Sequence, residues 1–371
     1  MSSIIKHFYL HVPFCTSRCG YCSFYTEPFS LTNKSEYLAT IAREIDIYQE
    51  RYTFNPRSIY FGGGTPSLLL PNELQEILNC FSYQKTICEI TLECNPITLT
   101  DTYLEELSTT DINRVSLGIQ SLNPQFLKYL NRKHSPELVE KVVVSLRKKG
   151  FKNVSGDLIY GIPHQTLEDL EADIEKFIQL DLDHISIYCL SLDNDAKLYP
   201  DVQKLPQDEL VSDMYNLICE KLSLAGFEQY EISNFTKLGH QSKHNRSYWE
   251  QEDYLGFGAG AFGTLDNIRY NNNDFKAWVT DIRDEQIILN IEELSYKDKL
   301  NEYIMLGLRL NKGIDLVDLK RTYHFDLTHQ KESIINKYLE LNLLEMNEKR
   351  LCLTAKSRFI SNYIISELME D

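Results

Sequence analysis

The chain has 371 residues, which at roughly 150 residues per domain suggests two or three domains. Hydrophobic residues make up 43% and charged residues 25%, so a large core is expected and intrinsic disorder is not. The net charge of -16 argues against general nucleic-acid binding and against strong attraction to anionic membranes. Without an 18-residue apolar run or a secretory signal, we expect a cytoplasmic chain that does not insert stably into a membrane.

Segments that favour strands and segments that favour helices alternate along the first half of the chain. The expected strands are 8–12, 58–62, 90–93, 114–120, 154–161 and 184–191, and the expected helices are 34–52, 71–81, 101–107, 136–149 and 167–180. A spacing of roughly 30 residues is typical of βα units on a parallel sheet. Six such strands fall short of an eight-stranded barrel, so we predict an α/β fold with a partial (β/α)6 barrel. Functional side chains are then expected at the carboxyl ends of the strands.

Nine cysteines in a reducing compartment are a poor disulfide framework, and their spacing suggests a metal site instead. Cys15, Cys19 and Cys22 form C-x3-C-x2-C directly after the first expected strand. Three thiolates are soft ligands that could hold a [4Fe-4S] cluster and leave one iron open to a small molecule. Zinc is the alternative metal, although it would need a fourth ligand, and three buried structural thiols are the alternative without metal. The other six cysteines are scattered, and we interpret them as core thiols.

Polar residues and glycines follow several of the expected strands. The run Gly62–Thr65 follows the second strand, and its glycines would let the backbone approach a ligand, although a tight turn alone is the other interpretation. Glu93, Gln120 and Asp157 lie on or at the ends of the next three strands, and Arg132 follows Gln120. Together they supply acceptors for ribose hydroxyls and a cation for a carboxylate.

A C-x3-C-x2-C loop after a first strand resembles the radical S-adenosylmethionine (radical SAM) proteins. In that family the amino and carboxylate groups of S-adenosylmethionine (SAM) occupy the open iron. The phrases Gly62-Gly-Gly-Thr-Pro-Ser-Leu, Asn113-Arg-Val-Ser-Leu-Gly-Ile-Gln-Ser and Gly156-Asp-Leu-Ile-Tyr-Gly-Ile-Pro closely resemble the oxygen-independent coproporphyrinogen III oxidase-like branch, which includes the HemW-type heme chaperones. The resemblance implies a radical SAM barrel with SAM contacts at Tyr9, Tyr21, Gly63, Gly64, Thr65, Glu93, Gln120, Arg132 and Asp157.

Two departures favour the chaperones over the dehydrogenases of this branch. The dehydrogenases carry a further cysteine where this chain has Phe24, and they have a longer arm than the 14 residues before Cys15. The resemblance therefore implies a chaperone that binds heme and passes it to an acceptor hemoprotein, with a [4Fe-4S] cluster and exchangeable SAM. Oxidative decarboxylation by an oxygen-independent coproporphyrinogen III dehydrogenase is the alternative, and we do not expect that activity.

The segment His244-Asn-Arg-Ser-Tyr-Trp249 matches a phrase of the chaperone-like branch and suggests a heme-binding region. Residues 232–249 contain Lys237, Lys243 and Arg246 but no acid. Heme offers an iron that accepts imidazole, an apolar face and two propionates. His244 is therefore the candidate heme ligand, with His240 as the competing imidazole, although an isolated histidine is more often simply hydrogen-bonded.

A second glycine motif and the C-terminal quarter complete the organisation. Gly258–Gly263 fits G-x-G-x-x-G, but 250–256 is a poor strand, so we expect a close-packed loop there rather than a dinucleotide site. Beyond it, the pattern predicts helices at 296–310, 315–323 and 330–341, strands at 343–346 and 351–353, and a last helix capped by Thr354.

Helices followed by a hairpin predict an α+β, winged-helix-like domain, which we interpret as a packing or partner-docking unit. A DNA-binding or scaffolding protein is a third interpretation, and the acidic charge and the intact cysteine motif disfavour it. The predicted domains are a barrel at 1–235, a heme-associated linker region at 236–290 and the C-terminal domain at 291–371.

Overall fold

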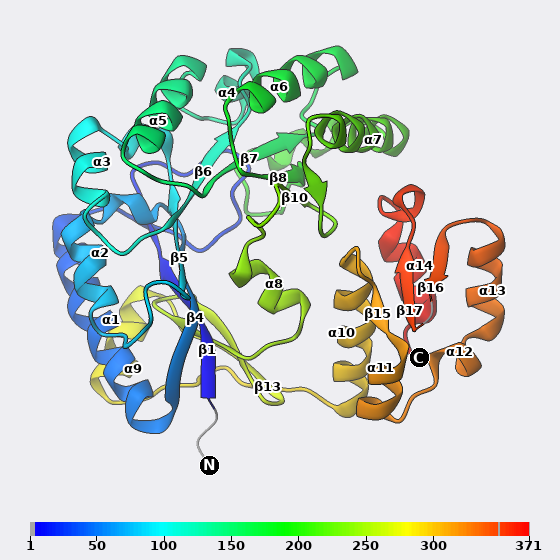
Figure 1. The fold of residues 1–371 in the computed structure, drawn as a ribbon. Coiled ribbons are helices and arrows are strands. Elements are labelled where there is room, and N and C mark those ends of the chain that lie inside the picture. The colour runs from blue at the N-terminus through cyan, green and yellow to red at the C-terminus, as the bar shows by residue number, and fades with distance from the viewer. Residues whose placement is uncertain (1–3, 348, 371) are drawn as a thin grey trace.

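A computed structural model describes residues 4–347 and 349–370 of the chain (Figure 1). Six strands lie parallel and side by side in the order β1 (Ile4–Val12), β4 (Thr53–Gly63), β5 (Glu89–Cys94), β6 (Arg114–Gln120), β7 (Val154–Tyr160) and β8 (His184–Cys189). They form an open arc with helices on its outer side, which confirms the predicted partial barrel.

The helices on the outer face follow the predicted pattern with shifted ends. They are α1 (Leu31–Arg51), α2 (Pro71–Leu78), α3 (Asp101–Leu107), α5 (Pro136–Lys148) and α6 (Leu167–Gln179). The first begins three residues earlier than predicted because the Ser30 side chain accepts a hydrogen bond from the Asn33 amide and caps it. Among the helices between residues 31 and 224, α4 (Pro124–Tyr129) and α7 (Asp208–Leu224) were not predicted. Short 3-10 helices lie at Pro66–Leu68, Pro96–Thr98 and Tyr199–Lys204.

The sheet continues beyond the arc at both edges. Beside β1 lie β11 (Tyr254–Phe257), β12 (Phe262–Leu265), β13 (Ile268–Asn271) and β14 (Glu292–Glu293), and beside β8 lie β10 (Asn234–Thr236) and β9 (Glu228–Gln229). The prediction that a poor strand precedes the Gly258 motif was wrong. Parallel pairing with β1 makes this segment a strand and buries Leu255 and Phe257 in the barrel core. The motif then leads into β12 rather than a helix, so it remains unlike a dinucleotide site.

Most of the stretch predicted as a linker region, 236–290, packs with the barrel. Its strands continue the barrel sheet, and α9 (Phe275–Arg283) contributes Trp278 and Ile282 to the barrel core. One helix of this stretch, α8 (Lys243–Trp249), lies on the inner side of the arc (Figure 1). It is therefore in a position to fill part of the barrel interior.

The C-terminal domain has its own core and the predicted helix-then-hairpin order. It contains α10 (Tyr296–Arg309), β15 (Ile314–Asp315), α11 (Leu316–Tyr323), α12 (Leu327–Gln330), α13 (Glu332–Glu340), β16 (Leu344–Asn347), β17 (Arg350–Leu353) and α14 (Ser361–Leu368). The prediction that Thr354 caps the last helix was wrong. Its hydroxyl donates to the carbonyls of Asn342 and Leu343, and a 3-10 turn at Ala355–Ser357 separates it from α14. Among the described residues no helix is long and apolar enough to cross a membrane.

Candidate functional site

The three-cysteine loop leaves the carboxyl end of β1 and is closed at its base. The short strands β2 (Phe14–Cys15) and β3 (Glu27–Pro28) pair in parallel, and the Glu27 amide donates to the Pro13 carbonyl at 2.8 Å. Cys15, Cys19 and Cys22 are half-buried between these ends. The fold therefore anchors the loop at the carboxyl ends of the barrel strands, where a partial barrel presents its functional groups.

The thiols share one electrostatic environment. Burial raises the pKa of Cys15, and the neighbouring thiols of Cys22 and Cys19 raise it further. Thr65 Oγ1 lies 3.5 Å from Cys15 Sγ, and Arg132 Nη1 donates to Cys19 Sγ at 3.3 Å. A nearby guanidinium and hydroxyl favour thiolates, which are the form that binds metal.

The three thiols are the type of ligand that an iron-sulfur cluster with three cysteine ligands requires. Three soft donors on one short loop, with a cation beside them, match what such a cluster requires. In the described part of the chain, however, no three His, Cys, Asp or Glu side chains are already arranged around one point. Among the described residues the loop thus carries three candidate thiol ligands that are not gathered around one point.

The glycine run lies directly against the cysteine loop. Gly63 has a φ of 111°, and its amide donates to Glu93 Oε2 at 3.2 Å. A Cβ on Gly64 would lie 2.7 Å from the Phe14 carbonyl oxygen, so only glycine allows this approach. The run is therefore more than a tight turn, because its close packing brings Thr65 to Cys15.

Two carboxyl groups, Glu93 and Asp157, lie on the inner side of the strands next to this loop. Tyr60 donates to Glu93 Oε1 at 2.7 Å, and burial raises the pKa of Glu93 to about 7. Burial likewise raises the pKa of Asp157 to about 6, while the guanidinium of Arg114 lowers it. These carboxyls are therefore poised to change charge near neutral pH.

The remaining predicted SAM contacts join the same region. Arg132 Nη2 donates to the Gly118 carbonyl at 2.5 Å. Although burial lowers the pKa of this guanidinium, the negative charges that Tyr21, Cys19 and Asp157 can carry raise it overall. Gln120 ends β6 with a left-handed φ of 71°. Tyr9 hydrogen-bonds His11 Nδ1 at 3.1 Å on β1. The predicted residues thus form one continuous region from the cysteine loop to the inner face of the sheet.

Sequence reasoning missed several polar residues that face the inside of the arc. They are His7, His11, Ser58, Tyr60, Arg114 and His184. The sequence contained a signal for them, because polar side chains occupy every second position along the strands, as His7, Tyr9 and His11 do on β1. The strands were identified from their apolar residues, which face the helices. The polar residues on the opposite face of the same strands were therefore not considered.

His244 lies inside the barrel rather than on an accessible surface. It is 1% exposed, with Nδ1 2.8 Å from Ser58 Oγ and Nε2 2.7 Å from the Tyr248 hydroxyl. Its ring stacks on Tyr60 at 4.9 Å. Burial holds its pKa well below the usual histidine value. Because both ring nitrogens are hydrogen-bonded, this arrangement does not favour His244 as a heme ligand; His240 lies apart, in a shallow pocket with Asp181 and Asp183.

The segment 232–249 contains no acidic residue, but acidic residues from other segments lie next to its basic side chains. Lys237 forms an ion pair with Asp181 at 3.0 Å, and Arg246 pairs with Glu250 at 2.7 Å. The expected docking of an anionic porphyrin on these basic residues therefore competes with existing ion pairs.

Comparisons with known proteins identify the family to which the chain is similar. Residues 9–177 match the radical SAM superfamily model, and residues 294–360 match the HemN C-terminal domain model. Similar curated proteins include "Heme chaperone HemW" of Lactococcus lactis, 34% identical over 98% of this chain and 97% of that protein, and "Heme chaperone HemW" of Bacillus subtilis, 31% identical over 98% and 99%.

Among solved structures, the Escherichia coli coproporphyrinogen III oxidase HemN, described as a radical SAM enzyme, matches with a TM-score of 0.86. It is 20% identical and the match covers 98% of this chain and 90% of that one, which establishes a shared fold. The full-length similarity at 34% identity establishes the family as well as the fold. The chain belongs to the HemW family of radical SAM proteins.

Proposed function

We propose that this protein binds heme and transfers it to an acceptor hemoprotein in the cytoplasm. The observation that carries the proposal is full-length similarity to curated heme chaperones, at 34% and 31% identity. The exposed side chain of Phe24, at the position of the dehydrogenases' additional cysteine, supports it. The acidic charge of -16 disfavours nucleic acid as a partner.

We propose that Cys15, Cys19 and Cys22 hold a [4Fe-4S] cluster with one open iron. When bound, such a cluster supplies an electron to SAM. In this proposal Arg132 meets the SAM carboxylate, since its guanidinium already lies at Cys19. Glu93 and Asp157 accept hydrogen bonds from ribose hydroxyls, and the glycine run lets the backbone approach the ligand. Tyr9, Tyr21 and Gln120 complete the proposed contacts.

The alternative is an oxygen-independent coproporphyrinogen III dehydrogenase. The TM-score of 0.86 to the E. coli enzyme favours it, but that likeness concerns the fold alone. The similarity to curated heme chaperones is the stronger observation, and we keep the dehydrogenase as the second candidate.

One experiment separates the two functions. The protein is reconstituted anaerobically with iron and sulfide, and the same sample is titrated with hemin and assayed with SAM for decarboxylation of coproporphyrinogen III. We expect a saturable Soret change and no decarboxylation. Decarboxylation without heme binding would replace the chaperone with the dehydrogenase.

The cluster assignment has its own control. Cys15→Ser is expected to lose most of the broad iron-sulfur absorbance after reconstitution, because a three-thiolate site loses one of its ligands. Cys80→Ser removes a thiol outside the loop and is expected to keep that absorbance. Equal absorbance in both variants would refute the assignment of Cys15.

A further inference from the structure

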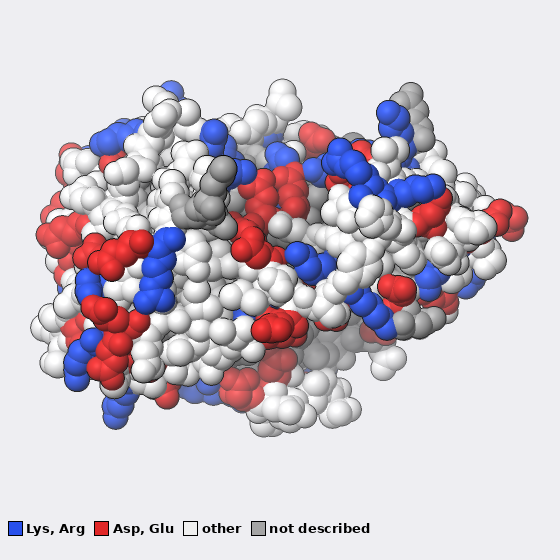
Figure 2. Space-filling view, turned by 90° about the horizontal axis from the view of Figure 1, so that it is seen from below, with Lys and Arg blue, Asp and Glu red and all other residues white. Residues whose placement is uncertain are grey.

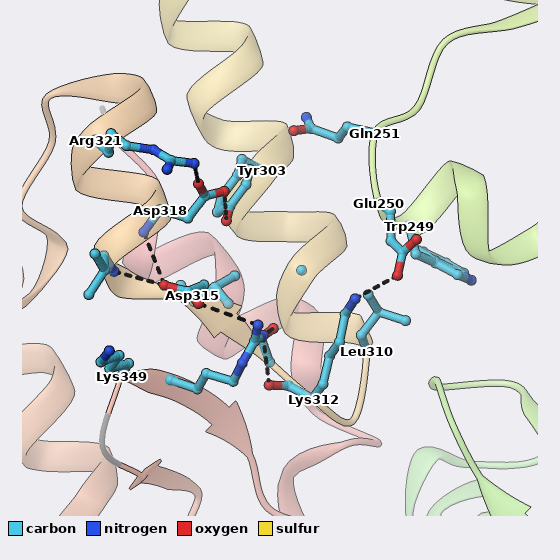
Figure 3. Close-up of a pocket in the computed structure, with 15 residues that line it drawn as sticks. Trp249, Glu250, Gln251, Tyr303, Leu310, Lys312, Asp315, Asp318, Arg321 and Lys349 are labelled. Carbon is cyan, nitrogen blue, oxygen red and sulfur yellow. Dashed lines mark hydrogen bonds and ion pairs between the residues drawn. The ribbon is translucent and has the colours of Figure 1, made fainter. Parts of the chain in front are cut away.

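A pocket of about 560 Å³ lies between the end of α8 and the C-terminal domain (Figure 3). Trp249 and Glu250 form one wall, and residues of α10, β15, α11 and β17 form the others. Its volume falls within the range of small-molecule sites, roughly 300–1,000 Å³. Trp249 is the last residue of the phrase His244–Trp249, so the pocket opens where that phrase leaves the barrel interior.

The charges around the pocket leave a small positive excess. Lys312 pairs with Glu250 at 2.6 Å, Arg350 pairs with Asp315 at 3.4 Å, and Arg321 pairs with Asp318. Lys349 also lines the pocket, where its charge helps to lower the pKa of Asp315, and among the described residues its ammonium makes no hydrogen bond or ion pair. Among the described lining residues, four cations against three anions give a local charge of +1 in a chain of net charge -16.

At a larger scale the C-terminal domain, 291–371, carries charges of both signs, with 12 basic and 14 acidic residues. Figure 2 shows the molecule from below, hollowed between the barrel and this domain, with acidic side chains in the hollow and basic ones beside it.

The rest of the lining suits a flat apolar ligand. Trp249, Tyr303, Leu310, Ile314 and Val317 contribute aromatic and aliphatic surface, and Val317 is 57% exposed. The lining contains no His, Cys or Met. A metal-containing ligand would be held here by its faces and its charged rim rather than by soft or imidazole ligands to the metal.

We propose that heme docks in this interdomain pocket, with a propionate on Lys349 and the porphyrin face against Val317 and Leu310. Ferric heme with two ionised propionates carries a net charge of -1, which matches the local excess of +1. The inference rests on the proposed function and names its binding site. It also explains how heme stays transferable, because a ligand held without an imidazole or thiolate bond to iron has no such bond to break on release.

The test uses two matched pairs of variants in the full-length protein, titrated with hemin by absorbance and with iron-free protoporphyrin IX by fluorescence. Val317→Trp fills the pocket, and Val144→Trp adds the same bulk at a valine of α5 that is 52% exposed. Lys349→Glu reverses the free charge, and Lys356→Glu makes the same change at an exposed lysine outside the pocket. Thermal unfolding midpoints check that each variant is folded.

We expect both pocket variants to weaken binding of both porphyrins at least tenfold and both controls to stay within twofold of the parent protein. Comparable affinity for the iron-free porphyrin is expected because no His, Cys or Met lines the pocket and the Tyr303 hydroxyl already donates to Asp318. If the parent protein binds hemin and the pocket variants bind it equally well, the pocket is wrong while the proposed function stands. If the parent protein binds no hemin, the proposed function itself fails. Loss of hemin binding only in His244→Ala would place the site inside the barrel.

Discussion

At the scale of single residues, the carboxyls of Glu93 and Asp157 are the groups whose charge is most sensitive to conditions. Burial raises their pKa values to about 7 and about 6, from ordinary values of 4.5 and 3.8. Arg114 opposes this shift at both sites and is itself 1% exposed. The inner face of the barrel thus holds carboxyls that ionise fully only above neutral pH.

A pH dependence of SAM binding follows from these two carboxyls. SAM carries a positive sulfonium, so we expect its affinity to rise between pH 6 and pH 8 as Glu93 and Asp157 lose their protons. Asp157→Asn should bind SAM more weakly and over a flatter pH profile, measured by calorimetry on the reconstituted protein.

The matched control is Glu106→Gln, which removes an exposed carboxylate of α3 and should leave the profile unchanged. A parent profile that is flat across this range would show that neither carboxyl acts on the bound ligand.

At the scale of elements, a buried carboxylate fastens α1 to the segments that follow β11. Glu44 is 0% exposed and accepts hydrogen bonds from the Gly258 amide at 2.8 Å, Asn272 Nδ2 at 2.7 Å and Trp278 Nε1 at 3.1 Å. The three donors lie more than 200 residues away in sequence. This contact holds the Gly258 turn, and with it β11, against the barrel.

Replacing Glu44 by Ala leaves the Gly258 amide and Trp278 Nε1 without a partner, whereas Asn272 Nδ2 keeps its hydrogen bond to the Gly258 carbonyl at 2.9 Å. Each unsatisfied donor costs about 1–3 kcal/mol, so we expect the free energy of unfolding to fall by at least ~2 kcal/mol. Chemical denaturation measures this, with Glu36→Ala on the exposed side of the same helix as control. A loss below ~1 kcal/mol would mean that water or rearrangement satisfies these donors.

The elements also show why sequence prediction succeeded where it did. The βα units were predicted because each carries its own apolar periodicity and local turn residues. β11 was missed because Tyr254–Phe257 is short, follows an acidic run, and becomes a strand only through pairing with residues 7–10. Non-local pairing of this kind leaves little local signal.

At the scale of the whole molecule, one contact between the two domains is a polar joint at Glu231, beside ion pairs such as Lys312–Glu250. Glu231 forms an antiparallel bridge with Leu310, and the Asn311 amide donates to the Tyr230 carbonyl at 3.1 Å. Glu231 is 0% exposed, and burial raises its pKa to about 7, while Arg309 lowers it. Because α10 ends at this joint and lines the proposed heme pocket, the joint and the pocket are mechanically linked.

The raised pKa of Glu231 predicts that the joint weakens with increasing pH. A buried carboxyl whose pKa lies above its unfolded value of 4.5 contributes stability at low pH that is lost as pH rises through about 7. A difference of about 2.5 pH units corresponds to about 3 kcal/mol at most.

We expect amide hydrogen exchange of residues 309–313 to accelerate between pH 4.5 and pH 7 and to level off above that, after correction for the intrinsic rate. Glu231→Gln, which cannot ionise, should remove most of this pH dependence. Protection that stays constant with pH in the parent protein would refute the role of Glu231.

The sequence by itself determined the six parallel strands, the cysteine loop and the glycine run, because each depends on neighbours within a few residues. Only the tertiary structure decided the surroundings of His244, whose imidazole is hydrogen-bonded to Ser58 from 186 residues away. The same holds for the partners of Lys237 and for the pocket between α8 and the C-terminal domain. Hydrogen bonds, ion pairs and cavities form between side chains that folding brings together, and the spacing of residues along one chain does not specify those pairs.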